Sequence, residues 1–170
     1  GIALIGCGEI GVVNAMAIKR SKNSNLKAVM DIDNKLANDV GKKMNISAFT
    51  DLDKMLNIND IDAVFISTPP DSHKNIIKKA AIKRKHIIVE KPMAPNVNDV
   101  EEIIRICQEN KVLLSVCFCY RYLSEIKKAK ALIEKGVIGE LLGSLTITHI
   151  DRPTFYYTSG RTSRSKSSWR

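Results

Sequence analysis

The stretch Gly6-Cys7-Gly8-Glu9-Ile10-Gly11 fits the pattern G-x-G-x-x-G near the start of this chain of 170 residues. It follows the apolar segment Ile2–Ile5, which predicts a strand, and it opens the segment Glu9–Arg20, which predicts a helix. The pattern by itself is a weak signal, but its place between a strand and a helix is typical of dinucleotide-binding folds. The loop therefore predicts a dinucleotide site at the end of the first strand.

Each glycine of this loop is expected at its position for a different physical reason. Gly6 permits a tight turn, Gly8 has no Cβ and so lets a pyrophosphate approach the main chain, and Gly11 lets the helix pack closely on the strand. The phosphates would then meet free N–H groups at the helix N-terminus, where the helix dipole favours negative charge. We expect the cofactor to contact Gly6, Gly8, Glu9, Ile10 and Gly11.

Asp31 follows the predicted second strand, Leu26–Met30, and lies twenty residues after Gly11. An acidic group at that place accepts hydrogen bonds from the ribose hydroxyls of the adenosine and would repel a 2′-phosphate. Asp33 could share this role. The sequence therefore predicts NAD rather than NADP as the cofactor. A methyltransferase would also use an early glycine loop and an acidic residue here, but it would not need the segments that follow.

Short apolar segments alternate with helical segments along most of the chain, which predicts βαβ units and a doubly wound parallel sheet. In the first helix we expect Ile10, Val13 and Ala17 to face the core. The predicted strands are Ile2–Ile5, Leu26–Met30, Ser47–Phe49, Ala63–Ile66, His86–Val89 and Val112–Cys117. The predicted helices are Glu9–Arg20, Lys35–Met44, Asp51–Leu56, one capped by Asp71 or Ser72, one capped by Asn98 or Asp99, and Ser124–Lys135, which Gly136 ends.

The segment Leu141–Ile150 departs from this rhythm and is expected to be a strand in a different sheet. The fold class is therefore α/β, with a Rossmann domain over residues 1–120 and the beginning of a second α/β domain over residues 121–170. The chain opens on a strand without an initiator methionine, and residues 159–170 are polar. We expect it to be a fragment of a longer protein, and to bind its cofactor weakly and turn over poorly by itself.

The chain is basic, with 27 Lys and Arg against 18 Asp and Glu, but the charge does not favour nucleic acid as the partner. Residues 151–170 contribute a net charge of +4 (five basic residues and one acidic), and the remaining +5 is spread over 150 residues. Aromatic residues make up only 5%, so stacking platforms for single strands are scarce. A nucleic-acid binder stays a third possibility, with binding that is sensitive to salt.

No apolar run approaches the length of a bilayer span, so no membrane partner is expected. The four cysteines lie in apolar stretches without the spacing of a metal site, apart from the sequence Cys117-Phe-Cys119. We therefore expect no metal, and a reduced, cytoplasmic protein.

Two further segments follow predicted strands, where ligands bind in open α/β sheets. They are Ile66-Ser67-Thr68-Pro69-Pro70-Asp71-Ser72-His73 and Val89-Glu90-Lys91-Pro92. Together with the glycine loop, they resemble the Gfo/Idh/MocA oxidoreductases, the group of glucose–fructose oxidoreductase and inositol dehydrogenase. The resemblance continues through residues 116–122 and 131–140 and covers essentially the whole chain. Its most specific element is Glu-Lys-Pro after a strand.

The resemblance implies a Rossmann domain followed by an α/β domain with an open, mostly antiparallel sheet. It implies hydride transfer between NAD(P) and a carbon that bears a hydroxyl, on a sugar, a sugar nucleotide or a cyclitol. It also implies that Lys91 is catalytic, that a cis Lys91–Pro92 peptide is allowed, and that the full-length protein is a homo-oligomer.

A lysine suits this role because oxidation of an alcohol requires removal of the hydroxyl proton as the hydride leaves. An amine beside that oxygen can take the proton, and its positive charge stabilises a developing alkoxide. From the residues alone, Glu90 and Lys91 could instead be a solvated charge pair that ends a strand.

The resemblance also implies cofactor contacts for residues on these two segments. Ser67, Thr68 and Pro69 match a loop that passes under the nicotinamide ribose and the pyrophosphate. Glu90 matches a residue that contacts the nicotinamide half. His73 matches a histidine near the cofactor, but at the start of a helix it could equally bond to the main chain.

Three more residues are matched near the end of the resemblance. Arg121 corresponds to an arginine after the sixth strand, and Trp169 with Arg170 corresponds to a pair that contacts the cofactor in some members. A segment of the family with a second acid–base histidine has no counterpart in this chain, and His149 is not a plausible substitute. The alternative function is therefore a nucleotide-binding sensor or scaffold that keeps the Rossmann half without catalysis.

Overall fold

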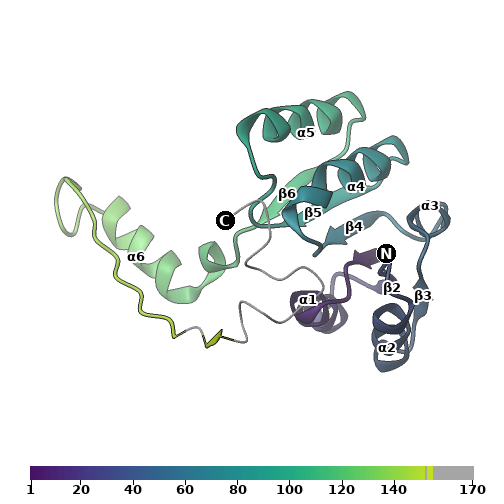
Figure 1. Ribbon diagram of the computed structural model, residues 1–170. Coiled ribbons are helices and arrows are strands. Elements are labelled where there is room, and N and C mark those ends of the chain that lie inside the picture. The colour runs from purple at the N-terminus through teal and green to yellow at the C-terminus, as the bar shows by residue number, and fades with distance from the viewer. Residues whose placement is uncertain (152, 155–170) are drawn as a thin grey trace. The chain divides into compact units, whose positions relative to one another are not determined.

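The structure is a computed structural model that describes residues 1–151 and 153–154. Among these residues, six strands form one parallel sheet (Figure 1). They are β1 (Ile2–Ile5), β2 (Leu26–Met30), β3 (Ser47–Phe49), β4 (Ala63–Ile66), β5 (His86–Glu90) and β6 (Leu114–Cys117). Their order is β3-β2-β1-β4-β5-β6, and each neighbouring pair is parallel. The chain thus builds outward from β1 in one direction, returns to β4 and builds outward in the other, which confirms the predicted Rossmann sheet.

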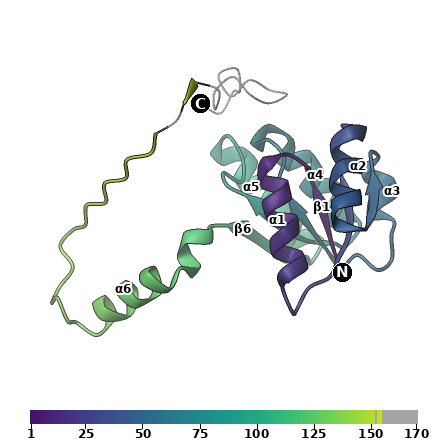
Figure 2. The ribbon, with the colours of Figure 1, turned by 90° about the horizontal axis from the view of Figure 1, so that it is seen from below.

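Helices cover both faces of this sheet. They are α1 (Glu9–Arg20), α2 (Asn34–Met44), α3 (Leu52–Leu56), α4 (Pro70–Ile82) and α5 (Val97–Glu109). In Figure 1, α4 and α5 lie above the sheet and α1 and α2 lie below it, and Figure 2 shows α1 and α2 on the near side. The helices that connect β1, β2 and β3 therefore lie on one face of the sheet, and the helices that connect β4, β5 and β6 lie on the other, as a doubly wound fold requires.

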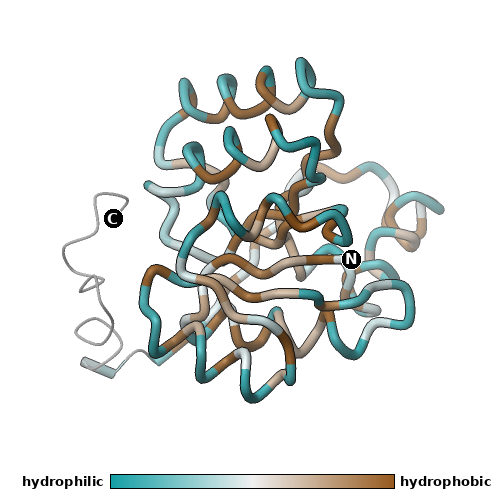
Figure 3. Tube along the Cα trace, turned by 90° about the vertical axis from the view of Figure 1, so that its right-hand side faces the viewer, coloured by the Kyte–Doolittle hydropathy of each residue, from teal (hydrophilic) through white to brown (hydrophobic). Residues whose placement is uncertain are grey.

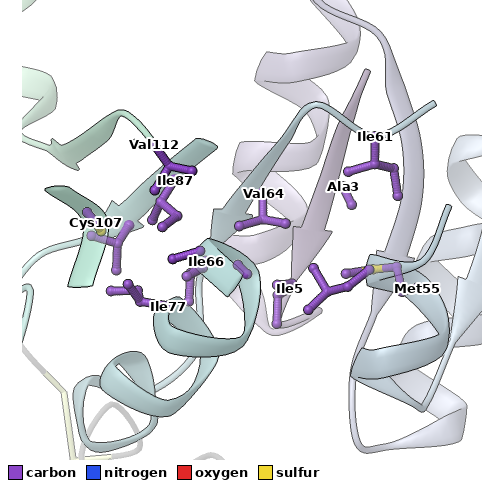
Figure 4. Close-up of a cluster of buried hydrophobic side chains, with 14 of the residues drawn as sticks. Ala3, Ile5, Met55, Ile61, Val64, Ile66, Ile77, Ile87, Cys107 and Val112 are labelled. Atoms are coloured by element: carbon purple, nitrogen blue, oxygen red, sulfur yellow. The ribbon is translucent and has the colours of Figure 1, made fainter. Parts of the chain in front are cut away.

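Successive side chains of the buried strands point to opposite faces and supply two hydrophobic clusters. In β1, Ala3 and Ile5 belong to the cluster under α3, α4 and α5, whereas Leu4 belongs to the cluster under α1 and α2. Figure 4 shows the first cluster, in which Ile5, Val64 and Ile77 are fully or almost fully buried. The central strands β1 and β4, which are buried on both faces, are apolar throughout, while the helices alternate between hydrophobic and hydrophilic residues along the trace (Figure 3).

The inward face of α1 differs from the predicted one. Ile10 and Val13 are 52% and 59% exposed and Ala17 is also exposed, so their expected core positions are wrong. The buried residues are Gly11, Ala15 and Ile18. A Cβ on Gly11 would overlap the carbonyl oxygen of Gly6, so the glycine fixes which side of the helix approaches the sheet. Because α1 lies so close to the sheet at Gly11, its side that faces the sheet carries small residues there. This packing decides the orientation of the helix, and the spacing of the larger apolar residues does not.

Two helix starts also differ from the expectation. The N-cap of α4 is Pro69 rather than Asp71 or Ser72, and the helix starts directly after it. The N-cap of α5 is Asn96, whose side chain accepts a hydrogen bond from the main-chain N–H of Asp99. Several residues near each start have capping chemistry, and only the path of the incoming chain decides which one takes the position.

The contacts of the chain divide it into two units, Gly1–Cys117 and Phe118–Arg170. The described part of the second unit contains the short 3₁₀ helix η1 (Cys119–Tyr122) and α6 (Ser124–Glu134), and Gly136 follows α6 with a φ of +70°. The strand predicted over Leu141–Ile150 is wrong, because this segment has no regular structure. A strand needs a neighbour to satisfy its main-chain groups, and no described residue pairs with this segment. No helix in residues 1–151 and 153–154 is long and apolar enough to cross a membrane.

Candidate cofactor-binding site

The predicted site residues of the first unit follow the carboxyl ends of four neighbouring strands. Asp31 follows β2, the glycine loop follows β1, Ser67 follows β4, and Lys91 follows β5. Because all strands are parallel, these ends share one edge of the sheet, and the strand order places the four groups in that sequence along it. The point where the chain reverses its building direction lies between β1 and β4, the place where open α/β sheets bind their ligands.

The glycine loop has the three properties expected from its sequence. Gly6 has a φ of +95°, and a Cβ there would lie 2.8 Å from the main chain of Ser67. Gly8 is exposed and has nothing within 4 Å of the place a Cβ would take, and Gly11 packs against Gly6. No side chain caps the N-terminus of α1 at Gly8. This open, uncapped helix start fits a phosphate, which would be bound by main-chain N–H groups.

The carboxylate of Asp31 reaches the glycine loop directly. Its Oδ2 accepts a hydrogen bond from the main-chain N–H of Cys7 at 2.8 Å, and its Oδ1 accepts one from the N–H of Asp33 at 2.8 Å. The neighbouring Asp33 instead caps α2, where its side chain accepts from the N–H groups of Lys35 and Leu36. Asp33 therefore has a structural role, and Asp31 is the acidic group beside the loop.

The thiol of Cys7, inside the glycine loop, is inert for a structural reason. Its side chain is only 2% exposed, and its Sγ lies 3.6 Å from the carbonyl oxygen of Met30. Burial, with a smaller contribution from the negative charge of Asp31, raises the pKa of this thiol to about 12. Cys7 is therefore a packed, protonated residue and no nucleophile.

A residue that sequence reasoning did not single out, Asn14, links the ends of β4 and β5. Its Nδ2 donates to the Oγ of Ser67 at 2.9 Å and to the Oε1 of Glu90 at 3.0 Å. The signal in the sequence was an asparagine within the otherwise apolar centre of a helix, where its side chain is unfavourable unless it bonds elsewhere.

Lys91 is exposed at the end of β5, and its peptide bond to Pro92 is cis, as the resemblance allows. Its main-chain N–H donates to the Oε2 of Glu90 at 3.2 Å. Its amine forms no ion pair with a carboxylate of the described residues. Glu90 is thus engaged with Asn14 and the main chain, and the amine of Lys91 has no hydrogen-bond or ion-pair partner among residues 1–151 and 153–154.

His73 is fully buried and bridges the two loops that follow β4 and β5. Its Nε2 lies 2.8 Å from the carbonyl oxygen of Thr68, and its Nδ1 lies 3.1 Å from that of Met93. The hydroxyl of Thr68 lies 2.7 Å from that of Ser72, whose Oγ also donates to the carbonyl of Pro69. His73 therefore contacts main chain, and a direct contact with the cofactor stays a prediction.

The family model described as "Oxidoreductase family, NAD-binding Rossmann fold" matches residues 1–118. The chain belongs to the Gfo/Idh/MocA family. Its NAD-binding Rossmann fold is the unit described above, with the glycine loop and Lys91 at the carboxyl ends of the parallel strands.

Curated relatives of this Gfo/Idh/MocA chain include hydratases, dehydrogenases and oxidoreductases without a stated substrate. It is 31% identical over 142 residues to a 2,7-anhydro-N-acetylneuraminate hydratase of Mediterraneibacter gnavus, a match of 84% of this chain and 37% of the relative. It is 28% identical over 140 residues to a myo-inositol 2-dehydrogenase of Thermotoga maritima, 82% of this chain and 42% of the relative. The chain thus spans about 40% of the length of such relatives.

Solved structures lead to the same group. A scyllo-inositol dehydrogenase from Lactobacillus casei, crystallised with NAD(H) and scyllo-inositol, matches with 27% identity and a TM-score of 0.77. The match covers 82% of this chain and 42% of that one. At this level of identity, the likeness supports both the fold and the cofactor.

For the remaining residues predicted to contact the cofactor in this Gfo/Idh/MocA chain, the structure gives less information. Glu9 and Ile10 are exposed in the first turn of α1. Arg121 is exposed on η1, in the second unit, and Trp169 and Arg170 lie outside the described residues. No cluster of three or more metal-ligand side chains is present in the part of the chain that the structure describes.

Proposed function

We propose that this chain is the cofactor-binding part of an NAD-dependent oxidoreductase that acts on a secondary alcohol or ketone of a sugar, a sugar nucleotide or a cyclitol. The supporting observation is the order of groups along one edge of the sheet: Asp31, then the open glycine loop, then Lys91. That order suits a dinucleotide with its adenosine beside Asp31 and its nicotinamide beside β4 and β5.

When bound, NAD supplies the carbon that accepts or returns the hydride. The task left to the chain is the proton: in alcohol oxidation, the neutral amine of Lys91 accepts the hydroxyl proton as the C–H bond breaks. In the reverse direction the ammonium returns that proton and stabilises negative charge on the oxygen. The exposed side chain of Lys91 and the engagement of Glu90 elsewhere support this assignment.

We propose NAD as the cofactor in preference to NADP because of Asp31. A carboxylate at the end of β2 accepts hydrogen bonds from the ribose hydroxyls and repels a phosphate in their place. We also propose that Ser67, Thr68, Pro69, Glu90, His73, Arg121, Trp169 and Arg170 contribute to the cofactor site.

For the rest of the protein, we propose that residues 121–170 begin a domain for substrate binding and oligomerisation, and that the full-length protein is a cytoplasmic homo-oligomer. Four free cysteines, two of them buried, support a reducing compartment.

A fluorescence titration of the chain with NADH and NADPH tests the cofactor, and formation of NADH from NAD⁺ with myo-inositol, scyllo-inositol, glucose 6-phosphate or D-apiose tests the reaction. We expect tighter binding of NADH than of NADPH, and turnover of a polyol by the full-length protein. If the chain bound neither NADH nor NADPH, the proposal would be overturned.

The hydratase among the relatives supports a second candidate, in which the same site acts without net oxidation. Such an enzyme would convert its substrate without accumulating NADH, so chromatography of the product beside NADH absorbance separates the two. A sensor would bind NADH and convert no substrate of either class.

A further inference from the structure

Asn14 lies where α1 comes closest to the sheet. It is three residues after Gly11 and next to Ala15, so it belongs to the inward side of the helix. Because Gly11 lets α1 pack against Gly6, the short amide side chain of Asn14 reaches the ends of β4 and β5, which are the next two strands after β1 in the sheet.

Both hydrogens of this amide are used on strand ends that are distant in sequence. One bond runs to Ser67 after β4 and the other to Glu90 at the end of β5, at 2.9 and 3.0 Å. The carboxylate of Glu90 can only accept, so the nitrogen of the Asn14 amide must face it. Hydrogen bonds to a charged oxygen are among the stronger ones in proteins.

The second oxygen of Glu90 accepts the main-chain N–H of Lys91 at 3.2 Å. The carboxylate is thus held on both sides, between α1 and the start of the Lys91 segment. Without Asn14, its outer oxygen would be able to rotate, and the Oγ of Ser67 would lose its partner on the helix.

We propose that Asn14 is a positioning residue for the nicotinamide half of the cofactor, because its amide holds Ser67 and Glu90 in one preorganised surface. The inference rests on the proposed function, since it takes NAD to lie across β1 with its nicotinamide beside β4 and β5. Asn14 acts through these two residues, and the adenosine half beside Asp31 does not depend on it.

The test compares NADH with ADP, which lacks both the nicotinamide and its ribose, as ligands of the 170-residue chain. Asn14→Asp keeps the shape of the side chain but places an acceptor oxygen against the carboxylate of Glu90. We expect the Kd for NADH to rise on the order of tenfold and the Kd for ADP to stay within about twofold. Asn14→Ala, which removes both donors without adding charge, should likewise raise the Kd for NADH and leave the Kd for ADP nearly unchanged.

Exchanging the amide and the carboxylate between positions 14 and 90 should restore the contact and, with it, the affinity for NADH. In the double variant Asn14→Asp with Glu90→Gln, the introduced amide can donate to the introduced carboxylate, so the contact returns with opposite polarity. We expect Asn14→Asp to change NADH affinity much less in the Glu90→Gln background than in the wild type. The matched control is Asn38→Asp, an exposed asparagine of α2 bonded only to Asn34, which should affect neither ligand.

The outcomes separate the two proposals. If the wild type binds neither ligand, the proposed function fails and this inference fails with it. If the wild type binds both, and the Asn14 variants weaken both equally or weaken neither, the proposed function stands and the positioning role is overturned. Thermal unfolding of each variant identifies a general loss of structure, which would weaken the binding of ADP as much as that of NADH.

Discussion

The main-chain N–H of Cys7, after β1, donates a hydrogen bond to the carboxylate of Asp31, after β2, with 2.8 Å between the nitrogen and Oδ2. The group proposed to bind the adenosine ribose is therefore also the group that anchors the loop proposed to bind the pyrophosphate. Each carboxylate oxygen can accept more than one hydrogen bond, so Asp31 can keep this contact while it accepts from the ribose hydroxyls. The two halves of the proposed adenosine diphosphate site would therefore share one side chain.

Substitutions of Asp31 should separate these two roles. Asp31→Asn keeps an oxygen for the N–H of Cys7 but loses the charge, so NADH should bind more weakly while NADPH gains relative to it. Asp31→Ala also releases the loop, and should weaken NADH further, on the order of tenfold or more. Fluorescence titration measures both. Unchanged affinities for both nucleotides in Asp31→Ala would contradict the ribose assignment.

Substitution by alanine should affect a different property at each of two glycines: cofactor binding at Gly8 and the stability of the fold at Gly11. Gly8 has open space around its Cβ position, so Gly8→Ala should leave the melting temperature unchanged and weaken NADH binding by obstructing the pyrophosphate. Gly11→Ala places a methyl group against the carbonyl of Gly6 and should lower the free energy of unfolding by about 3 kcal/mol or more. Thermal melts and NADH titration distinguish them, and equal effects would contradict the geometry of the loop.

Lys91→Met should abolish turnover of the full-length protein and leave the cofactor bound. Loss of a proton-transfer group costs about a hundredfold or more in kcat, whereas the affinity for NADH should change little. Lys78→Met, on the exposed side of α4, is the matched control and should retain full activity. A variant of Lys91 with normal kcat would show that the residue is only a solvated strand end.

The buried thiol of Cys7 should make the protein less stable at alkaline pH. Its pKa is raised from 9.0 to about 12 in the fold, so above pH 9.0 the unfolded chain loses a proton that the folded chain retains. The stabilisation is present below pH 9.0 and declines as the pH rises towards 12. In denaturant titrations, Cys7→Ala should flatten this decline, whereas Cys119→Ala, at an exposed position, should not.

His73→Phe should destabilise the first unit, because it removes from a fully buried side chain the ring N–H that can donate to the carbonyl oxygen of Thr68 or of Met93. We expect the free energy of unfolding to fall by about 2 kcal/mol in a urea titration. The exposed His149 is the control, and His149→Phe should have no effect. Equal stability of the two variants would show that the bridge contributes nothing.

The sheet and most of its helices were predictable because their signals are local. Apolar runs such as Ala63–Ile66 are short and continuous, and the glycine loop marks the first turn. The inward face of α1 and the segment Leu141–Ile150 were predicted wrongly. In α1, close packing at Gly11 outweighs the pattern of large apolar residues, and over Leu141–Ile150 alternation alone provides no neighbouring strand.

The candidate site was predictable where a residue follows a strand, as Asp31, Ser67 and Lys91 do, because a parallel sheet brings all such ends to one edge. The roles of these three residues in binding and catalysis stay predictions, as do those of Arg121, Trp169 and Arg170. Asn14 was missed because its function depends on contacts that no sequence window contains: Glu90 is 76 residues away along the chain.

The order of residues alone was sufficient for the fold class, the glycine loop and the lysine after the fifth strand, since each depends on periodicity or spacing over a few residues. The folded chain alone decided that Asp31 holds Cys7, that Asn14 joins Ser67 to Glu90, and that His73 spans two loops. Hydrogen bonds act over about 3 Å, so only the packing of helices on the sheet determines which distant groups come within that distance.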